Sequence, residues 1–219
     1  MKGLRTVSVV DALATSLRDR VLDGEITPGA GLTETEVAEE YEVSRPTAKA
    51  ALGQLVHAGL LRREAHKTAY VPRLSQADVE DLFLVRIPLE LEVVHRVASN
   101  QRVPAGADDA VRDLAAVPAD GAHSEFVEAD LRFHRKLVEA VGSPRLSRLY
   151  GLLTGEIHLS MVQSRSALGR DRIVREHSAI LDALHRGDDI EAIALMRGHL
   201  EGARDALGRH LGPAAGARH

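Results

Sequence analysis

Residues Leu32–Leu52 have the sequence Leu-Thr-Glu-Thr-Glu-Val-Ala-Glu-Glu-Tyr-Glu-Val-Ser-Arg-Pro-Thr-Ala-Lys-Ala-Ala-Leu, which contains two helix starts. Thr33 followed by Glu36 forms a capping box that opens a short helix. Ser44 is a second N-cap, and Pro46 lies in the first turn behind it, where proline loses no helical hydrogen bond. Two short capped helices joined by a tight turn predict a helix-turn-helix.

The second of these helices combines an apolar stripe with a polar N-terminal end. Its inward positions are Ala48, Ala51, Leu52, Leu55 and Val56. Arg45, Thr47 and Lys49 lie off that stripe, where a recognition helix meets base edges and phosphates. A helix over about 10–22, with Val10, Leu13, Leu17 and Val21 at helical spacing, precedes the motif.

Two short apolar runs follow, and they predict a hairpin. Leu60–Arg63 and Ala69–Val71 flank His66, Lys67 and Thr68, so the hairpin forms a wing with a basic tip. Three helices and a hairpin occur in DNA-binding modules and also in protein-interaction domains. Both interpretations stay open on pattern alone.

The charge distribution favours DNA. The chain has a formal net charge of −4, yet residues 43–75 hold six basic residues and one acid, Glu64. A basic segment on an acidic body suits a protein that touches phosphates with one surface. A solvated charge run is the alternative.

The run from Leu17 to Val71 resembles the GntR superfamily of regulators. The motifs are Gly-Glu-Ile-Thr-Pro-Gly, Leu-Thr-Glu-Thr-Glu-Val-Ala-Glu and Val-Ser-Arg-Pro-Thr-Ala-Lys-Ala-Ala-Leu. The resemblance implies DNA contacts from the segment, expected at Arg45, Thr47, Lys49, Thr35, Ser44, His66 and Lys67. Thr35 stands where relatives often have arginine, and the wing lacks their glycines.

After residue 73 the sequence predicts an all-helical bundle, so the fold class is mainly α with an N-terminal winged helix-turn-helix. The domains expected are 1–73 and 75–212, with residues 213–219 a disordered tail. Proline, glycine or an N-cap marks each break between the helical segments. These segments are Ser75–Ser99, Pro104–Val117, Ser124–Val141, Pro144–Ala167, Arg170–Arg186 and Asp188–Leu211.

Histidines occupy the inward stripes of three of these helices. Asp130 and His134 project from one helix face, and His177 and His199 lie in line with aliphatic residues on two others. Buried imidazoles need partners, and a lone one is usually satisfied within the core. Three of them with a carboxylate fit a divalent metal site for zinc, nickel, manganese or iron. Histidines satisfied within the core are the alternative on spacing alone.

This part of the chain resembles the FCD ligand-binding domain of FadR-type GntR regulators. The matching pieces are Leu84-Val-Arg through Glu90, Asp130-Leu-Arg-Phe-His134, Glu176-His-Ser-Ala-Ile180 and Met196-Arg-Gly-His-Leu200. In metal-containing members an aspartate and three histidines ligate one ion. The resemblance places that role on Asp130, His134, His177 and His199. The other histidines, expected at the surface or in the core, are His57, His66, His95, His123, His158, His185, His210 and His219.

Open metal positions suit a small organic acid, because effectors of similar domains are often carboxylates. Arg86 is the candidate clamp, since a guanidinium holds a carboxylate through two hydrogen bonds. The alternative for Arg86 is an ion pair with Glu90, four residues on. The expected partners are double-stranded operator DNA with a palindromic site, the acid, and a second copy of the chain.

Composition narrows the classes of protein further. Apolar residues make up 44% and charged residues 27% of the 219, with no cysteine and no run of membrane-span length. A cytoplasmic regulator that is not an enzyme is the expectation. The alternatives are a metal-dependent hydrolase or lyase, for which Glu128 and Glu139 are poorly placed as bases, and a regulator with a purely structural metal.

Overall fold

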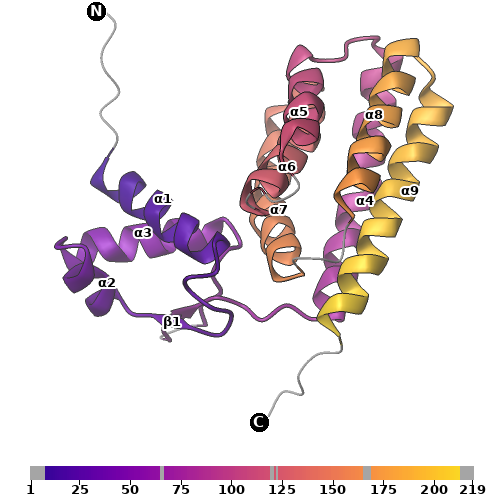
Figure 1. Cartoon of the computed structure of the whole chain (residues 1–219). Coiled ribbons are helices and arrows are strands. Elements are labelled where there is room, and N and C mark those ends of the chain that lie inside the picture. The colour runs from indigo at the N-terminus through magenta and orange to yellow at the C-terminus, as the bar shows by residue number, and fades with distance from the viewer. Residues whose placement is uncertain (1–7, 65–66, 119–120, 122, 165–168, 213–219) are drawn as a thin grey trace, which may run out of the picture. The chain divides into compact units, whose positions relative to one another are not determined.

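The computed structural model describes residues 8–64, 67–118, 121, 123–164 and 169–212. The chain divides into two compact units, Met1–Arg73 and Leu74–His219. The tail expected at 213–219 lies outside the described residues. The architecture is mainly helical in both units, as predicted (Figure 1).

The first unit is a trihelical fold with a small sheet. Its helices are α1 (Val9–Leu22), α2 (Glu34–Glu40) and α3 (Arg45–His57), and α3 packs against the other two. The fully buried side chains of its core include Leu17, Ala48, Ala51 and Leu52. The apolar stripes of α1 and α3 therefore meet in one core, and the polar N-terminal end of α3 stays at the surface.

Side-chain caps start α2 and α3 where the sequence predicts. The backbone N–H of Glu36 donates to Thr33 Oγ1 at 3.1 Å, and the Thr33 N–H donates to Glu36 Oε2 at 3.3 Å. At α3 the Thr47 N–H donates to Ser44 Oγ at 3.2 Å. The predicted helix-turn-helix is confirmed.

The wing differs from its prediction in one respect. Among the described residues, strand β2 (Ala69–Tyr70) meets the preceding arm at the bridge Arg62–Tyr70, with both backbone hydrogen bonds at 2.9 Å. Its other edge pairs antiparallel with β1 (Gly31–Leu32), in the register Gly31 to Tyr70. The strand expected over Leu60–Arg63 is therefore only a bridge, and β1 was missed because two residues show no alternation.

Within the described residues the second unit contains six helices, close to the predicted segments. Their bounds are α4 (Gln76–Ser99), α5 (Ala105–Ala116), α6 (His123–Ala140), α7 (Pro144–Gln163), α8 (Arg170–Arg186) and α9 (Asp189–Leu211). Helix α4 packs along α9, α8 along α9, α5 along α6 and α6 along α7. Helix α7 ends at Gln163, before the predicted Ala167, and residues 165–168 lie outside the described part.

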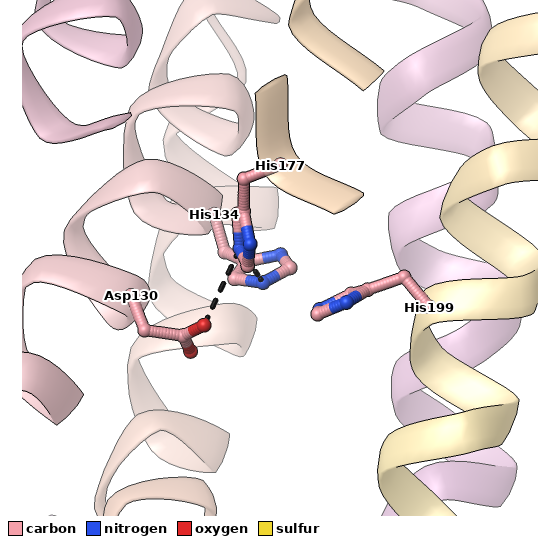
Figure 2. Close-up of side chains that lie close together, drawn as sticks. All are labelled: Asp130, His134, His177 and His199. Atoms are coloured by element: carbon pink, nitrogen blue, oxygen red, sulfur yellow. Dashed lines mark hydrogen bonds and ion pairs between the residues drawn. The ribbon is translucent and has the colours of Figure 1, made fainter. Parts of the chain in front are cut away.

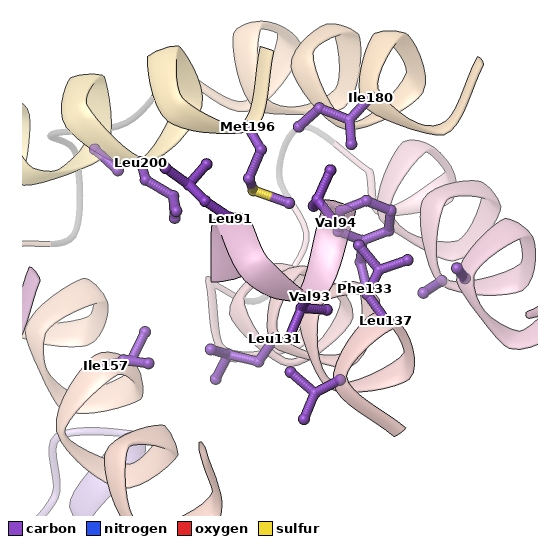
Figure 3. Packing of buried hydrophobic residues seen from close by; sticks show 14 of the residues in the cluster. Leu91, Val93, Val94, Leu131, Phe133, Leu137, Ile157, Ile180, Met196 and Leu200 are labelled. Carbon is purple, nitrogen blue, oxygen red and sulfur yellow. The ribbon is translucent and has the colours of Figure 1, made fainter. Parts of the chain in front are cut away.

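The core of this unit forms around α4. Figure 3 shows Leu91, Val93 and Val94 of α4 among buried side chains from neighbouring helices. Those neighbours are Leu131, Phe133 and Leu137 of α6, Ile157 of α7, Ile180 of α8, and Met196 and Leu200 of α9. Each Å² of apolar surface that is buried stabilises the fold by about 25 cal/mol, so this packing fixes the helices relative to each other. In the described part of the chain, no helix is long and apolar enough to cross a membrane.

Candidate functional site

Four side chains meet inside the helical bundle. Asp130 and His134 come from α6, His177 from α8 and His199 from α9, and each offers a ligand atom within 4.8 Å of the other three. Figure 2 shows them converging on one point. All four are buried, because the apolar stripes that carry them form the core. The structure therefore brings the four predicted residues together.

Backbone geometry fixes the proton of the His177 ring. Its Nδ1 lies 2.8 Å from the Ile173 carbonyl oxygen, one helical turn back. A carbonyl can only accept, so Nδ1 carries the proton and Nε2 presents a lone pair to the cluster. Burial is the largest of the effects that hold the pKa of His177 well below its ordinary value, followed by the charges of His199 and His134.

In the other two histidines, a carboxylate accepts a hydrogen bond from Nδ1. Nδ1 of His134 donates to Glu90 Oε2 at 2.5 Å, and Nδ1 of His199 donates to Glu176 Oε2 at 2.9 Å. Burial lowers the pKa of His199, against the opposing effect of Glu176. A histidine that ligates a metal usually donates its other ring N–H to a carboxylate or a carbonyl, and all three do so here.

The inner faces of these side chains form a set of electron-pair donors. Nε2 of His177 lies 3.2 Å from Nε2 of His134 and 3.3 Å from Asp130 Oδ1. That carboxylate oxygen is buried and accepts no hydrogen bond from any described residue. Because the His177 proton is on Nδ1, the short contact to Asp130 is no ion pair. Facing lone pairs repel, and a cation between them removes the repulsion, so the donor set fits a metal ion.

A buried ion pair lies next to the cluster. Arg86 Nε donates to Glu90 Oε1 at 2.6 Å, and the Tyr150 hydroxyl donates to the same oxygen at 3.1 Å. Burial on its own would raise the pKa of Glu90, but the charges of Arg86 and His134 outweigh it and hold that pKa well below its ordinary range. The ion pair predicted as the alternative for Arg86 is therefore present. Its Nη2 is buried without a hydrogen-bond partner among the described residues.

Five of the predicted DNA-contact residues lie at or beside the N-terminal end of α3, namely Ser44, Arg45, Thr47, Lys49 and Thr35. Arg45 and Lys49 are exposed, and Thr47 is half-buried. Arg45 Nη2 of α3 donates to Thr35 Oγ1 of α2 at 2.6 Å. Thr35, which stands where relatives often have arginine, therefore orients the Arg45 side chain. Ser44 Oγ lies 2.8 Å from Thr47 Oγ1.

At the wing, Lys67 Nζ pairs with Glu64 Oε2 at 2.5 Å. His66 lies outside the described residues. The predicted wing cation is therefore partly neutralised by an acid three residues earlier.

Sequence reasoning missed the residues that hold the outer nitrogens of the histidines. Glu176 of α8 accepts from His199 of α9, 23 residues away, and Glu90 of α4 accepts from His134 of α6, 44 residues away. Each pairing joins two helices, so spacing within one helix does not show it. The carboxylates considered as general bases are on the surface instead. Glu128 pairs with Arg135 at 2.8 Å, and Glu139 pairs with Lys136 at 2.7 Å.

Two family models match the chain, one in each unit. Residues 10–71 match the gntR family of bacterial regulatory proteins, and residues 81–202 match the FCD domain. The second match covers more than half of the chain. The protein belongs to the GntR family, in the group whose C-terminal part is an FCD domain.

Relatives with established names are transcriptional regulators. The chain is 26% identical over 212 residues to the HTH-type transcriptional regulator LutR of Bacillus subtilis, covering 85% of this chain and 95% of LutR. It is also 26% identical over 222 residues to the galactonate operon transcriptional repressor of Escherichia coli, covering 87% of this chain and 93% of that repressor. This protein is a GntR-family transcriptional regulator with an FCD effector-binding domain, and not an enzyme.

A solved structure shares the fold. The GntR transcriptional regulator from Rhodococcus sp. RHA1 superposes with a TM-score of 0.79 at 23% identity, covering 90% of this chain and 96% of that one. At this identity the likeness shows the fold alone.

Proposed function

We propose that this regulator binds a small carboxylate at a divalent transition metal in its FCD domain and changes its operator affinity in response. The observation that carries the proposal is the inward-facing set of donor atoms described above. Three imidazoles give their protons outward, and Asp130 Oδ1 is buried without a hydrogen bond. We assign the ligand role to Asp130, His134, His177 and His199.

The donor set restricts the kind of metal. Imidazole nitrogen with one carboxylate oxygen suits zinc, nickel, manganese or iron, whereas calcium and magnesium prefer oxygen ligands. When bound, such an ion supplies a Lewis acid with free positions for an anionic ligand. Burial keeps His177 and His199 neutral, and a neutral imidazole is the form that ligates.

Arg86 supports the choice of a carboxylate as effector. Its Nε serves Glu90, and its buried Nη2 has no partner among the described residues, so one edge of the guanidinium is available to an anion. Glu90 contacts both Arg86 and His134, so Arg86 lies one residue away from the cluster. The galactonate repressor supports the same class, because galactonate is a sugar acid.

The first unit supports the DNA half of the proposal. We assign base and phosphate contacts to Arg45, Thr47 and Lys49 of α3, with Thr35, Ser44, His66 and Lys67 beside them. Because each chain supplies one recognition helix, a homodimer on a palindromic operator gives two half-sites about one DNA turn apart. An effector that favours one arrangement of the two helices shifts the fit to that spacing.

Thermal melting tests the sensor. The full chain is dialysed against chelator and melted with and without Zn²⁺ in the presence of acetate, L-lactate or D-galactonate. We expect at least one acid to raise Tm, because a ligand that binds only the folded state stabilises it. The rise must require Zn²⁺. His199→Gln removes it, whereas His210→Gln, at an exposed position of the same helix, keeps it.

The acid is then tested on DNA that the protein itself has selected from random duplexes. An acid that raises Tm must also change the Kd for that DNA. If Zn²⁺ raises Tm and none of the acids does, the metal is structural and the sensor proposal is wrong.

A further inference from the structure

We propose that Glu90 is the positioning residue of this centre, and that it ties the metal ligand His134 to the carboxylate clamp Arg86. The inference rests on the proposed metal site and names the contact that regulates it. Glu90 touches both residues with separate oxygens of one buried carboxylate. Sequence spacing links Glu90 to Arg86 only, and the structure adds His134.

One oxygen sets the orientation of a metal ligand. Oε2 of Glu90 accepts from His134 Nδ1 at 2.5 Å, across the contact between α4 and α6. Glu90 is only 2% exposed, so water cannot replace it there. The contact keeps the His134 proton on Nδ1 and points Nε2 inward.

The other oxygen holds the clamp. Oε1 accepts from Arg86 Nε at 2.6 Å and from the Tyr150 hydroxyl at 3.1 Å. A carboxylate ligand that binds Arg86 competes with Oε1 for the guanidinium. When Arg86 shifts toward the ligand, its interaction with Glu90 weakens, and the interaction of Glu90 with His134 becomes stronger. His134 then binds the metal more tightly. Because linkage is reciprocal, metal then raises carboxylate affinity by the same factor.

Glu90 differs from the partners of the other two histidines. The acceptor for His177 is a carbonyl of its own helix, and Glu176, the acceptor for His199, is 27% exposed. Neither contact involves α4. Glu90 thus connects the centre to the helix that starts at Gln76, three residues after the first unit ends at Arg73.

Co²⁺ binding to the full chain tests the inference, with affinity measured by competition with a chelator. Glu90→Gln keeps the shape of the side chain, but its amide cannot accept from Arg86 and His134 at once. We expect Co²⁺ affinity to fall about 10- to 100-fold, the usual cost of losing such a partner. The matched control is Glu92→Gln on the same helix, where an exposed glutamate pairs with Arg96, and it should leave affinity unchanged.

A second readout follows the ring itself. In metal-free protein, ¹⁵N NMR should show His134 as the Nδ1–H tautomer, and Glu90→Gln should move the proton toward Nε2. A merely structural role for Glu90 would not move that proton. An unchanged tautomer together with unchanged Co²⁺ affinity overturns the inference.

Glu90→Gln leaves Arg86 buried without its counter-ion, which can unfold the protein. The double variant Arg86→Met/Glu90→Gln removes both charges and keeps the test valid. It should also bind Co²⁺ about 10- to 100-fold more weakly, because His134 still lacks its anion. Wild-type affinity in the double variant contradicts the inference. If the wild-type chain itself binds no Co²⁺, the proposed metal site fails instead.

Discussion

Each imidazole of the cluster depends on one atom behind it. The carbonyl of Ile173 and the carboxylates of Glu90 and Glu176 accept hydrogen bonds from the outer ring nitrogens, so the Nε2 atoms of the three rings face inward together. The arrangement is costly in the absence of a cation, because buried polar atoms without partners destabilise a fold. Stability of the metal-free protein should therefore report on the cluster.

The buried histidines predict a pH dependence of the metal-free protein. Burial lowers the pKa of His177 and His199 below the value of about 6.5 that an unfolded chain has. Below that pH the unfolded chain binds more protons than the folded one. The free energy of unfolding is then lost as pH falls, by up to about 1.4 kcal/mol per pH unit for each histidine, and is constant above it.

Urea unfolding in chelator at pH 7.5, 6.5 and 5.5 measures this loss. His177→Gln should flatten the pH dependence, and His210→Gln, at an exposed position, should retain it. Equal slopes in the wild type and in His177→Gln would show that this ring is not held neutral by its surroundings.

Sequence spacing predicted part of the site and could not predict the rest. Asp130 and His134 lie one helical turn apart, as do Arg86 and Glu90, so each pair follows from helix periodicity. The contact between Glu90 and His134 joins two helices 44 residues apart, and no local pattern encodes it. Only the packing of α4 against α6 brings those side chains together.

Helix α2 ends in a hydrogen-bonded motif that normally uses glycine. The Val43 N–H donates to the Ala38 carbonyl at 3.0 Å, and the Glu42 N–H donates to the Glu39 carbonyl at 3.4 Å. This is a Schellman motif, and Glu42 occupies its left-handed position with φ of 53°. A side chain in this conformation costs about 1 kcal/mol or more.

Glu42→Gly should therefore stabilise the protein by about 1 kcal/mol, because glycine adopts this φ without a steric penalty. Denaturant unfolding gives the value. Glu39→Gly is the control, since it places glycine inside α2 and should destabilise by up to about 1 kcal/mol. Destabilisation by both substitutions would mean that the turn is not strained.

The helix starts could be predicted from the sequence, but the small sheet could not. Capping residues such as Thr33 and Ser44 mark helix starts locally, so α2 and α3 begin where the sequence predicts. Strand β1 holds only Gly31 and Leu32, which are too few residues for an alternating pattern. It becomes a strand only because β2 lies beside it.

Positive charge is concentrated in the DNA-binding part of the chain, whereas the chain as a whole is acidic. Residues 43–75 carry the local positive charge on a chain whose formal net charge is −4. Because DNA binding releases counter-ions, affinity should fall steeply as salt rises. Contacts from Arg45 and Lys49 should account for part of that dependence.

Arg45→Ala/Lys49→Ala should weaken binding to selected duplex DNA and reduce the slope of log affinity against log salt by about 2, one for each lost phosphate contact. Arg145→Ala/Arg148→Ala is the matched control, because it removes two exposed arginines from α7. Fluorescence anisotropy over a salt series measures both. A loss of slope in the control pair alone would place the DNA surface elsewhere.

The number of metal ions bound per chain shows whether the four buried side chains form a metal centre. Wild-type protein and His177→Gln are stripped with chelator, saturated with Co²⁺, desalted and analysed for cobalt per chain. We expect one ion per wild-type chain and almost none in His177→Gln, with His210→Gln equal to the wild type. Equal cobalt in His177→Gln and the wild type, or none in the wild type, would rule out a metal centre at these residues.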